Sequence, residues 1–231
     1  TQEIDDFLKI QNFDNKKFKA DLCKKIRHLD KFSELPVKYR QINGVKEGLI
    51  PFHSGTEMDL KILNRNLLAY LGQFRDLAIG ESELCFCGIE RHAIQGRVMC
   101  IGEENGKKQY QLTLLNSGFG NVYHDTLTRN SSEGKHSLYS RDLTISGIDE
   151  DSMMEHLKKM LHAKTEPSKK GLESVYNIQA TVQKTHGNFS QQYLESLRHI
   201  PSCDYAKEQK GGTCTNGCMT CLYSNLIRNP D

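Results

Sequence analysis

The sequence predicts an α+β fold in which an antiparallel sheet is flanked by helices and preceded by a helical N-terminal part. Apolar residues recur at helical spacing in residues 1–80 and again after residue 150. Residues 83–116 instead contain short apolar runs separated by turn residues. Because helices and strands are segregated along the chain, an antiparallel sheet is favoured over a parallel one. We therefore expect a helical N-terminal subdomain at residues 1–82 and a second domain at residues 83–231.

The strongest helical pattern covers about residues 57–79. Leucines and other apolar residues recur there at steps of three and four, which is the spacing of one buried helix face. Thr56 is placed to cap the first turn, because its hydroxyl oxygen can accept a hydrogen bond from a free amide group. Gly80 follows the last periodic residue and ends the helix. This helix leads directly into the predicted sheet.

Three strands form the predicted meander, at about residues 83–89, 93–101 and 108–115. Asn105-Gly106 lies between the second and third strands, and this pair tolerates the positive φ angles of a tight hairpin. A fourth strand is expected at residues 138–146. In an antiparallel pair, the beginning of one strand lies beside the end of the next. Residues flanking the second and third strands are therefore brought together.

Helical spacing returns after the sheet. Asp149 is placed to cap a helix over about residues 150–163, and a polar linker follows at residues 164–170. The remaining pattern predicts three further helices, at about residues 171–183, 190–199 and 215–227. A loop at residues 200–213 precedes the last of them.

The nearly neutral charge balance bears on which kind of partner the protein binds. The 231 residues carry a formal net charge of +2, which disfavours nonspecific nucleic-acid binding as a property of the whole chain. No stretch reaches the roughly 20 apolar residues of a membrane span, and the N-terminus lacks the apolar core of a secretory signal. We expect a protein partner, no nucleic acid, no membrane span and no cofactor.

Eight cysteines are the most informative feature of the composition. A chain of this length can bury a core without disulfides, so we expect reduced thiols in a reducing compartment. Four of the eight lie within the last 30 residues, namely Cys203, Cys214, Cys218 and Cys221. Three different chemistries are compatible with this cluster.

Two of these chemistries use a metal. Cys214, Cys218 and Cys221 have the C-x3-C-x2-C spacing of radical-SAM enzymes, but those enzymes place the motif early in a long barrel, and here only ten residues follow it. The four thiolates could instead hold zinc, for which His199 is a substitute ligand. Structural zinc sites pair two short cysteine knuckles, whereas ten residues separate Cys203 from Cys214.

The third chemistry uses Cys214 alone, as a nucleophile. Gly211-Gly212-Thr213 precedes it and a predicted helix follows it. A thiol at a helix N-terminus lies at the positive end of the helix dipole and near free amide groups, which favour the thiolate. The two glycines allow a substrate backbone to approach closely. Cys218 and Cys221 then become small buried side chains inside the helix.

A nucleophilic cysteine needs a base and a residue that orients the base. His92 lies at the beginning of the second strand, and Asn116 follows the end of the third, so the antiparallel pairing places them close together. An asparagine oxygen can accept a hydrogen bond from the imidazole and fix its tautomer. Gln209 precedes Cys214 by five residues and can donate an amide N–H to an oxyanion. His124 and Asp125 are the alternative base and orienting acid.

The order His92, Asn116, Gln209, Cys214 resembles the adenain and ubiquitin-like-protease superfamily of cysteine peptidases, clan CE. More closely, three segments resemble a cysteine-protease-like module found in effectors of intracellular bacteria such as Legionella. The segments are His92-Ala93, then Asn116-Ser117-Gly118-Phe119-Gly120 with Tyr123-His124, then Gln209-Lys210-Gly211-Gly212-Thr213-Cys214. The resemblance covers about residues 83–227.

The resemblance implies a cysteine-protease-like fold and a thiol hydrolase, a peptidase or isopeptidase, with Cys214 as nucleophile and His92 as base. Asn116 would orient His92, and Gln209 would stabilise the oxyanion. It further implies host proteins or ubiquitin-like conjugates as substrates and a bacterial effector translocated to the host cytoplasm. Three alternatives stay open, namely an acyltransferase on the same fold, an inactive protease-fold interaction module, and a zinc-stabilised binding domain.

Overall fold

The computed structural model describes most of the chain between residues 57 and 206. Contacts divide the chain into two compact units, residues 1–33 and 34–231, and every element below belongs to the second. The described residues are 57–89, 92–131, 134–163, 166–202 and 205–206, with scattered positions between 20 and 32. They form helices and antiparallel sheets, which confirms the α+β class. No helix within these ranges is long and apolar enough to cross a membrane.

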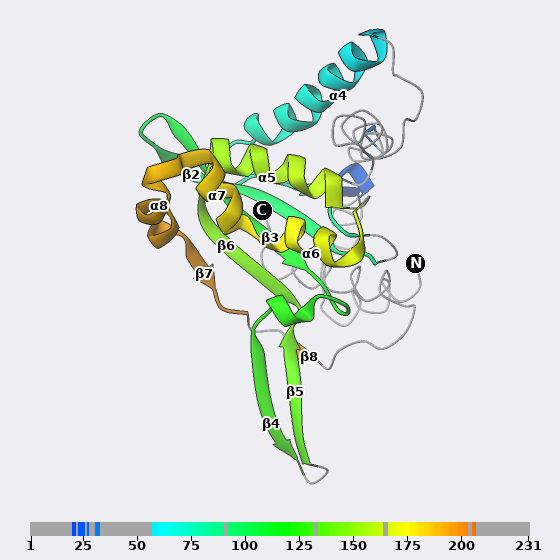
Figure 1. Ribbon diagram of the computed structural model, residues 1–231, viewed down its shortest axis with the longest axis vertical. Coiled ribbons are helices and arrows are strands. Elements are labelled where there is room, and N and C mark those ends of the chain that lie inside the picture. Colours follow the sequence, from blue (N-terminus) through cyan, green and yellow to red (C-terminus); the bar gives the residue numbers. More distant parts are fainter. Residues whose placement is uncertain are drawn as a thin grey trace. The chain divides into compact units, whose positions relative to one another are not determined.

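A five-stranded antiparallel sheet forms the centre of this unit (Figure 1). Its strands, in spatial order, are β1 (Ser82–Cys85), β2 (Gln95–Glu104), β3 (Lys107–Leu115), β6 (Asp142–Asp149) and β7 (Arg198–Ile200). The predicted meander is confirmed, since β1 pairs with β2 and β2 with β3. The turn between β2 and β3 has positive φ at Asn105 (53°) and Gly106 (76°), as the sequence predicts.

A smaller sheet contains a hairpin that projects from the central sheet in Figure 1. Its strands are β4 (Thr126–Ser131), β5 (Gly134–Ser140) and β8 (Tyr205–Ala206), of which β4 and β8 were not predicted. The single strand expected at residues 138–146 was wrong, because the chain leaves one sheet and enters the other at Arg141. Ser140 hydrogen bonds to both sides of this corner, through its amide to Asp125 O (2.8 Å) and its hydroxyl to Asp142 O (2.9 Å).

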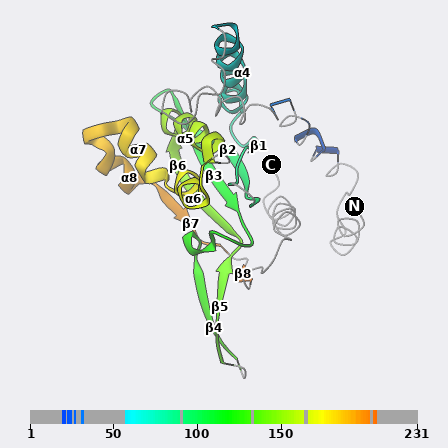
Figure 2. The ribbon, with the colours of Figure 1, turned by 45° about the vertical axis from the view of Figure 1, so that its right-hand side comes forward.

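Helices α5 to α7 lie against one face of the central sheet (Figure 2). The helices are α4 (Glu57–Arg75), α5 (Glu150–Ala163), α6 (Ser168–Tyr176), α7 (Ile178–His186) and α8 (Ser190–Ser196). Two short 3-10 turns, Asn121–Tyr123 and Gly187–Phe189, complete the set. The helix expected at residues 171–183 is instead two helices that meet at Asn177. The Asn177 amide caps α6 by donating to Glu173 O, and its side chain caps α7 by accepting from Ala180 N.

The C-terminal half of α4 packs within the same unit as the sheet. Tyr70 and Phe74 are completely buried. The Tyr70 hydroxyl accepts a hydrogen bond from Phe86 N (3.0 Å), and the Tyr110 hydroxyl of β3 donates to Phe74 O (3.2 Å). The end of this helix is therefore tied to the residues that follow β1 and to the middle of the sheet.

The core lies between the central sheet and the helices that cover it. The methionines of α5, Met153, Met154 and Met160, are buried, as their helical spacing indicated. Cys85, Cys87 and Cys100 are also buried and form no disulfide, as expected for small buried thiols, whereas Cys23, expected to be buried as well, is exposed. Burial raises the pKa of Cys85 well above its ordinary value, which makes this thiol unreactive.

Candidate active site

Asn116 lies directly after β3 and its side chain is completely buried. Its backbone amide donates a hydrogen bond to Arg141 O (2.9 Å), at the corner where the chain passes from β5 to β6. The following segment turns back over the side chain and reaches Gly120, which has φ +100°. The end of the strand and this turn together fix the position of Asn116.

His92 is held by a tight turn before β2. Its backbone amide and carbonyl both bond to Ile89, at 3.2 Å and 3.1 Å. Gly88 has φ +113°, and a Cβ atom there would lie only 3.0 Å from His92 O, so the turn requires glycine. The Nε2 atom of His92 lies 2.9 Å from Asn116 Oδ1. The predicted contact between these two residues, 24 positions apart, is therefore present.

Backbone groups fix the orientation of the Asn116 amide. Its Oδ1 atom accepts a hydrogen bond from Gly118 N (3.0 Å), and its Nδ2 atom donates to Phe119 O (2.9 Å). A backbone amide can only donate and a carbonyl can only accept, so these two contacts identify which amide atom is Oδ1 and which is Nδ2 in the folded protein. Since Oδ1 faces His92, the imidazole must donate from Nε2. In the neutral ring the lone pair then lies on Nδ1, which has no hydrogen-bond partner among the described residues.

Tyr176, at the end of α6, is a site residue that sequence reasoning missed. Its hydroxyl lies 3.0 Å from Asn116 Nδ2 and 3.0 Å from His124 Nε2. The position of the ring depends on the break between α6 and α7 at Asn177. A tyrosine on the apolar face of a helix carries no sequence signal of such a role.

The alternative base and acid considered from the sequence, His124 and Asp125, bond to groups other than His92 and Asn116. His124 is 5% exposed, and its Nδ1 atom bonds to Ser140 O (3.0 Å). Burial lowers the pKa of His124 to about 4, so this ring stays neutral near pH 7. Asp125 faces His199, at 3.4 Å between Oδ2 and Nε2. Of His92 and His124, His92 is the accessible one, and the buried His124 is linked to Asn116 through the Tyr176 hydroxyl.

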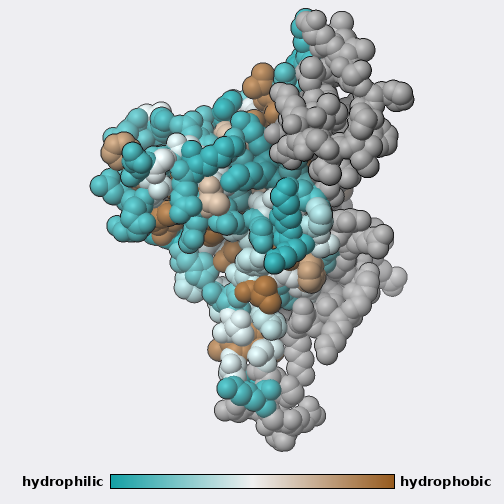
Figure 3. Space-filling model, in the orientation of Figure 1, coloured by the Kyte–Doolittle hydropathy of each residue, from teal (hydrophilic) through white to brown (hydrophobic). Residues whose placement is uncertain are grey.

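The segment after Asn116 gives the site an apolar border. The Phe119 ring meets the His92 ring edge-on, with centroids 6.2 Å apart and planes at 90°, and is 54% exposed. Val122 and Tyr123 are exposed beyond it. On the face shown in Figure 3, hydrophobic surface occurs as small patches within mostly hydrophilic surface. A local apolar border excludes water from one side of an imidazole and can contact an apolar substrate group.

Cys214 and Gln209 lie outside the described residues, so their placement beside His92 stays a prediction. The same holds for the proposed zinc ligands Cys203, Cys218 and Cys221. Within the described part of the chain, no group of three or more His, Cys, Asp or Glu side chains is arranged to hold a metal ion.

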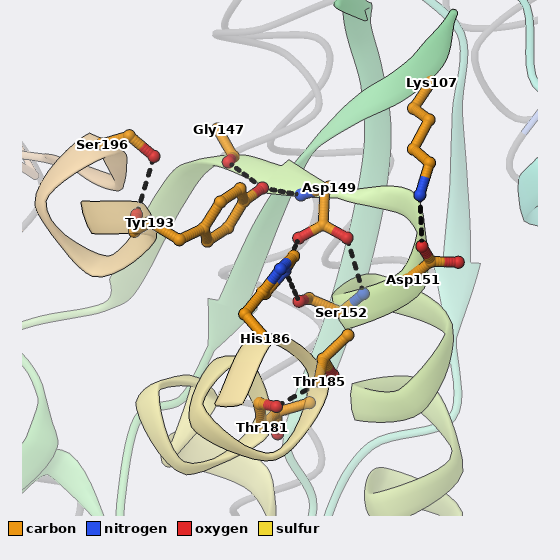
Figure 4. Close-up of polar contacts among 10 residues, drawn as sticks. All are labelled: Lys107, Gly147, Asp149, Asp151, Ser152, Thr181, Thr185, His186, Tyr193 and Ser196. Atoms are coloured by element: carbon orange, nitrogen blue, oxygen red, sulfur yellow. Dashed lines mark hydrogen bonds and ion pairs between the residues drawn. The ribbon is translucent and has the colours of Figure 1, made fainter. Parts of the chain in front are cut away.

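A second polar cluster joins Asp149, Ser152 and His186 (Figure 4). The Nε2 atom of His186 lies 2.8 Å from Asp149 Oδ2 and 3.1 Å from Ser152 Oγ. A Ser-His-Asp triad needs the serine on one ring nitrogen and the carboxylate on the other, whereas here both contact the same nitrogen. Ser152 is also completely buried. The cluster is therefore structural, and it anchors the beginning of α5 to the end of α7.

Comparison of the chain with protein-family models, curated proteins and solved structures finds no match.

Proposed function

We propose that the protein is a thiol hydrolase, a cysteine peptidase or isopeptidase, in which Cys214 is the nucleophile and His92 the base. The observation that supports this most is the 2.9 Å contact between His92 Nε2 and Asn116 Oδ1, with the amide orientation fixed by Gly118 and Phe119. A buried asparagine that forces an accessible histidine into one tautomer is the arrangement a thiol needs from its base.

In the proposed reaction, His92 Nδ1 takes the proton of Cys214 and the thiolate attacks a carbonyl carbon. The side-chain amide of Gln209 and the backbone N–H of Cys214 stabilise the oxyanion. The tetrahedral intermediate collapses, and the leaving amine takes the proton from His92. Water then attacks the thioester and gives a proton to His92. The C–S bond breaks, the carboxylic acid leaves, and the Cys214 sulfur takes the proton back from His92. Asn116 accepts the Nε2 proton throughout and so stabilises the imidazolium.

The substrate class comes from the sequence resemblance, which implies host proteins or ubiquitin-like conjugates and a role as a translocated bacterial effector. The apolar border at Phe119 is compatible with a polypeptide beside the base. An electrophilic ubiquitin probe tests the narrower proposal, because it forms a covalent adduct only with a nucleophile that ubiquitin can reach.

Alkylation by iodoacetamide tests the nucleophile directly. In the full chain at pH 6.5, Cys214 should react at least about tenfold faster than Cys218 and Cys221, which are internal controls, since only a stabilised thiolate is ionised there. Mass spectrometry of peptides gives the rate at each cysteine. His92→Ala should lower the Cys214 rate to that of the two controls.

His186→Ala is the matched histidine variant. His186 contacts Asp149 at the end of β6 opposite to the corner that holds Asn116, so the Cys214 rate should be kept. Equal alkylation of the three cysteines in the unmodified chain would refute the proposal and favour a non-enzymatic module. Stoichiometric zinc that withstands dialysis would also refute it.

A further inference from the structure

A chain of buried hydrogen bonds runs from His92 into the protein. After the contact with His92, Asn116 Nδ2 bonds to the Tyr176 hydroxyl, which bonds to His124 Nε2, and His124 Nδ1 bonds to Ser140 O, each at 3.0 Å. The members come from the end of β3, from α6, from the residue after the 3-10 turn and from the end of β5. Four separate segments are thus joined behind one accessible imidazole.

The last acceptor of this hydrogen-bond series, Ser140 O, fixes which group donates and which accepts in every earlier hydrogen bond. Ser140 O can only accept, so His124 donates from Nδ1. His124 is neutral near pH 7, since burial lowers its pKa to about 4, and its Nε2 atom therefore carries a lone pair. Tyr176 must use its single proton on that lone pair. Its oxygen then accepts from Asn116 Nδ2, which leaves Asn116 Oδ1 to accept from His92.

We propose that Tyr176 is a positioning residue which, together with His124, holds Asn116 so that His92 carries its proton on Nε2 and keeps Nδ1 as an acceptor. The consequence for catalysis rests on the proposed function. The tautomer of His92 is independent of the proposed function, because the hydrogen bonds of the fold determine it. Tyr176 is buried, and its ring stacks on Tyr123 with centroids 4.7 Å apart and planes at 6°, so the hydroxyl has little freedom to turn away.

Removal of the Tyr176 hydroxyl affects both of its neighbours. Asn116 Nδ2 would keep only Phe119 O as an acceptor, and the lone pair of His124 Nε2 would be buried without a donor. An unpaired buried group favours rearrangement, and the Asn116 amide would then be held only by Gly118 N, Phe119 O and His92, so its rotation would cost less than in the unmodified protein. Rotation of the amide would turn an N–H toward His92 and favour the opposite tautomer.

Nitrogen-15 NMR of the histidine side chains in the full chain tests this proposal without any substrate. At mildly alkaline pH, where ordinary imidazoles are neutral, His92 should carry its proton on Nε2 and His124 on Nδ1. His92→Ala and His124→Gln assign the two signals. Tyr176→Phe should convert His92 to a mixture of tautomers. Tyr123→Phe removes a hydroxyl from the stacked ring outside the chain of hydrogen bonds and should leave the His92 signal unchanged.

Two variants of His124 provide a test that does not depend on Tyr176→Phe. A glutamine can donate to Ser140 O and accept from the Tyr176 hydroxyl, so His124→Gln should preserve the His92 tautomer. His124→Leu can do neither, and it should give the same mixture as Tyr176→Phe. If Tyr176→Phe folds, its Cys214 alkylation should be about five- to tenfold slower than that of Tyr123→Phe, as expected for one hydrogen bond.

The outcomes separate this inference from the proposed function. If His92 carries its proton on Nδ1 in the unmodified chain, or if neither Tyr176→Phe nor His124→Leu alters its signal, the positioning role is wrong. If the tautomers are as stated but Cys214 is not more reactive than Cys218, the positioning role stands and the hydrolase proposal fails.

Discussion

Asn116 uses all of its hydrogen-bonding capacity inside the protein. Its oxygen accepts from Gly118 N and His92, and its nitrogen donates to Phe119 O and the Tyr176 hydroxyl. An amide is the only side-chain group of this size with two acceptor and two donor positions. The site is therefore built for asparagine, although an aspartate could also orient a histidine.

Asn116→Asp should therefore lower stability rather than improve the site. The carboxylate would face Phe119 O without a proton to donate, and it would be a buried charge. We expect the free energy of unfolding in urea to fall by about 2–4 kcal/mol at pH 7. Asn105→Asp, in the exposed hairpin turn where aspartate is tolerated, is the control and should change it by less than about 0.5 kcal/mol. Equal stability of the two variants would contradict this assignment of the hydrogen bonds.

At the residue scale, the sequence predicts contacts that follow from strand register and misses those that cross between layers. His92 and Asn116 flank β2 and β3, so antiparallel pairing alone places them together. Tyr176 is 60 residues from Asn116 and lies on a helix. Its contact depends on how α6 packs on the sheet, and nothing in the local pattern contains that information.

At the element scale, the turn from Asn116 to Gly120 joins the site to α6. Gly120 has φ +100°, and a Cβ atom there would lie 2.7 Å from Leu172 Cδ2 and 3.2 Å from Asn116 Nδ2. Gly80 has a similar φ of +89° with nothing within 4 Å of its Cβ position. The two glycines have the same backbone requirement, and only Gly120 also has a packing requirement.

Gly120→Ala should therefore be more harmful than Gly80→Ala. Left-handed backbone costs an alanine about 1–2 kcal/mol at either position, and overpacking adds about 1–3 kcal/mol at Gly120 alone. Thermal unfolding measures the difference. Gly120→Ala should also slow the alkylation of Cys214, because the displaced Asn116 no longer fixes His92. Equal losses of stability in the two variants would show that the turn can relax without disturbing the site.

The N-cap residues of α5 and α7 differ in the number and burial of the hydrogen bonds that their side chains make. Asp149 caps α5 by accepting from Ser152 N (3.0 Å), and its second oxygen bonds to His186. Burial alone would raise the pKa of Asp149, but the hydrogen bonds from Ser152 and His186 outweigh it and lower that pKa. Asn177 caps α7 by an exposed hydrogen bond to Ala180 N.

Asp149→Ala should cost about 2–3 kcal/mol of stability, because it leaves the buried Ser152 amide of α5 without a partner and removes the contact between Asp149 and His186 of α7. Asn177→Ala should cost only about 1 kcal/mol, which is typical of an exposed cap. Urea unfolding of both variants at pH 7 compares them directly. If Asn177→Ala proved the more damaging change, the cluster drawn in Figure 4 would not be what anchors α5.

Elements with strong local signals were predicted, and elements that depend on tertiary contacts were not. Helices α4 and α5 and the β1–β2–β3 meander follow from periodicity, capping and the Asn105-Gly106 turn. The corner at Arg141 divides a continuous β pattern because Ser140 bonds to both sheets. The break at Asn177 divides a continuous helical pattern because its side chain caps the second helix. Both interruptions occur at polar residues whose partners are revealed only by the fold.

At the scale of the whole molecule, two buried histidines link stability to pH. His124 lies behind the site, and His156 lies in α5, where its ring bonds to Thr181 Oγ1 and Val175 O at 3.0 Å each. Burial lowers the pKa of each to about 4 from an ordinary value of 6.5. Both rings are therefore neutral in the folded protein over a pH range in which the unfolded chain binds protons.

Stability should be constant between about pH 6.5 and pH 8, below the ordinary pKa of cysteine, and should fall as the pH drops from 6.5 to 4. In that window the unfolded state takes up a proton at each histidine and the folded state does not, which favours unfolding. Each histidine contributes a loss of up to about 3 kcal/mol over the window. The free energy of unfolding in urea, measured at half-unit steps of pH, gives the slope. His156→Gln keeps a donor for Val175 O and should reduce the slope, whereas the exposed His199→Gln should not. A flat profile between pH 6.5 and 5 would mean that neither ring is buried in solution, and the chain of hydrogen bonds behind His92 would then lose its fixed end.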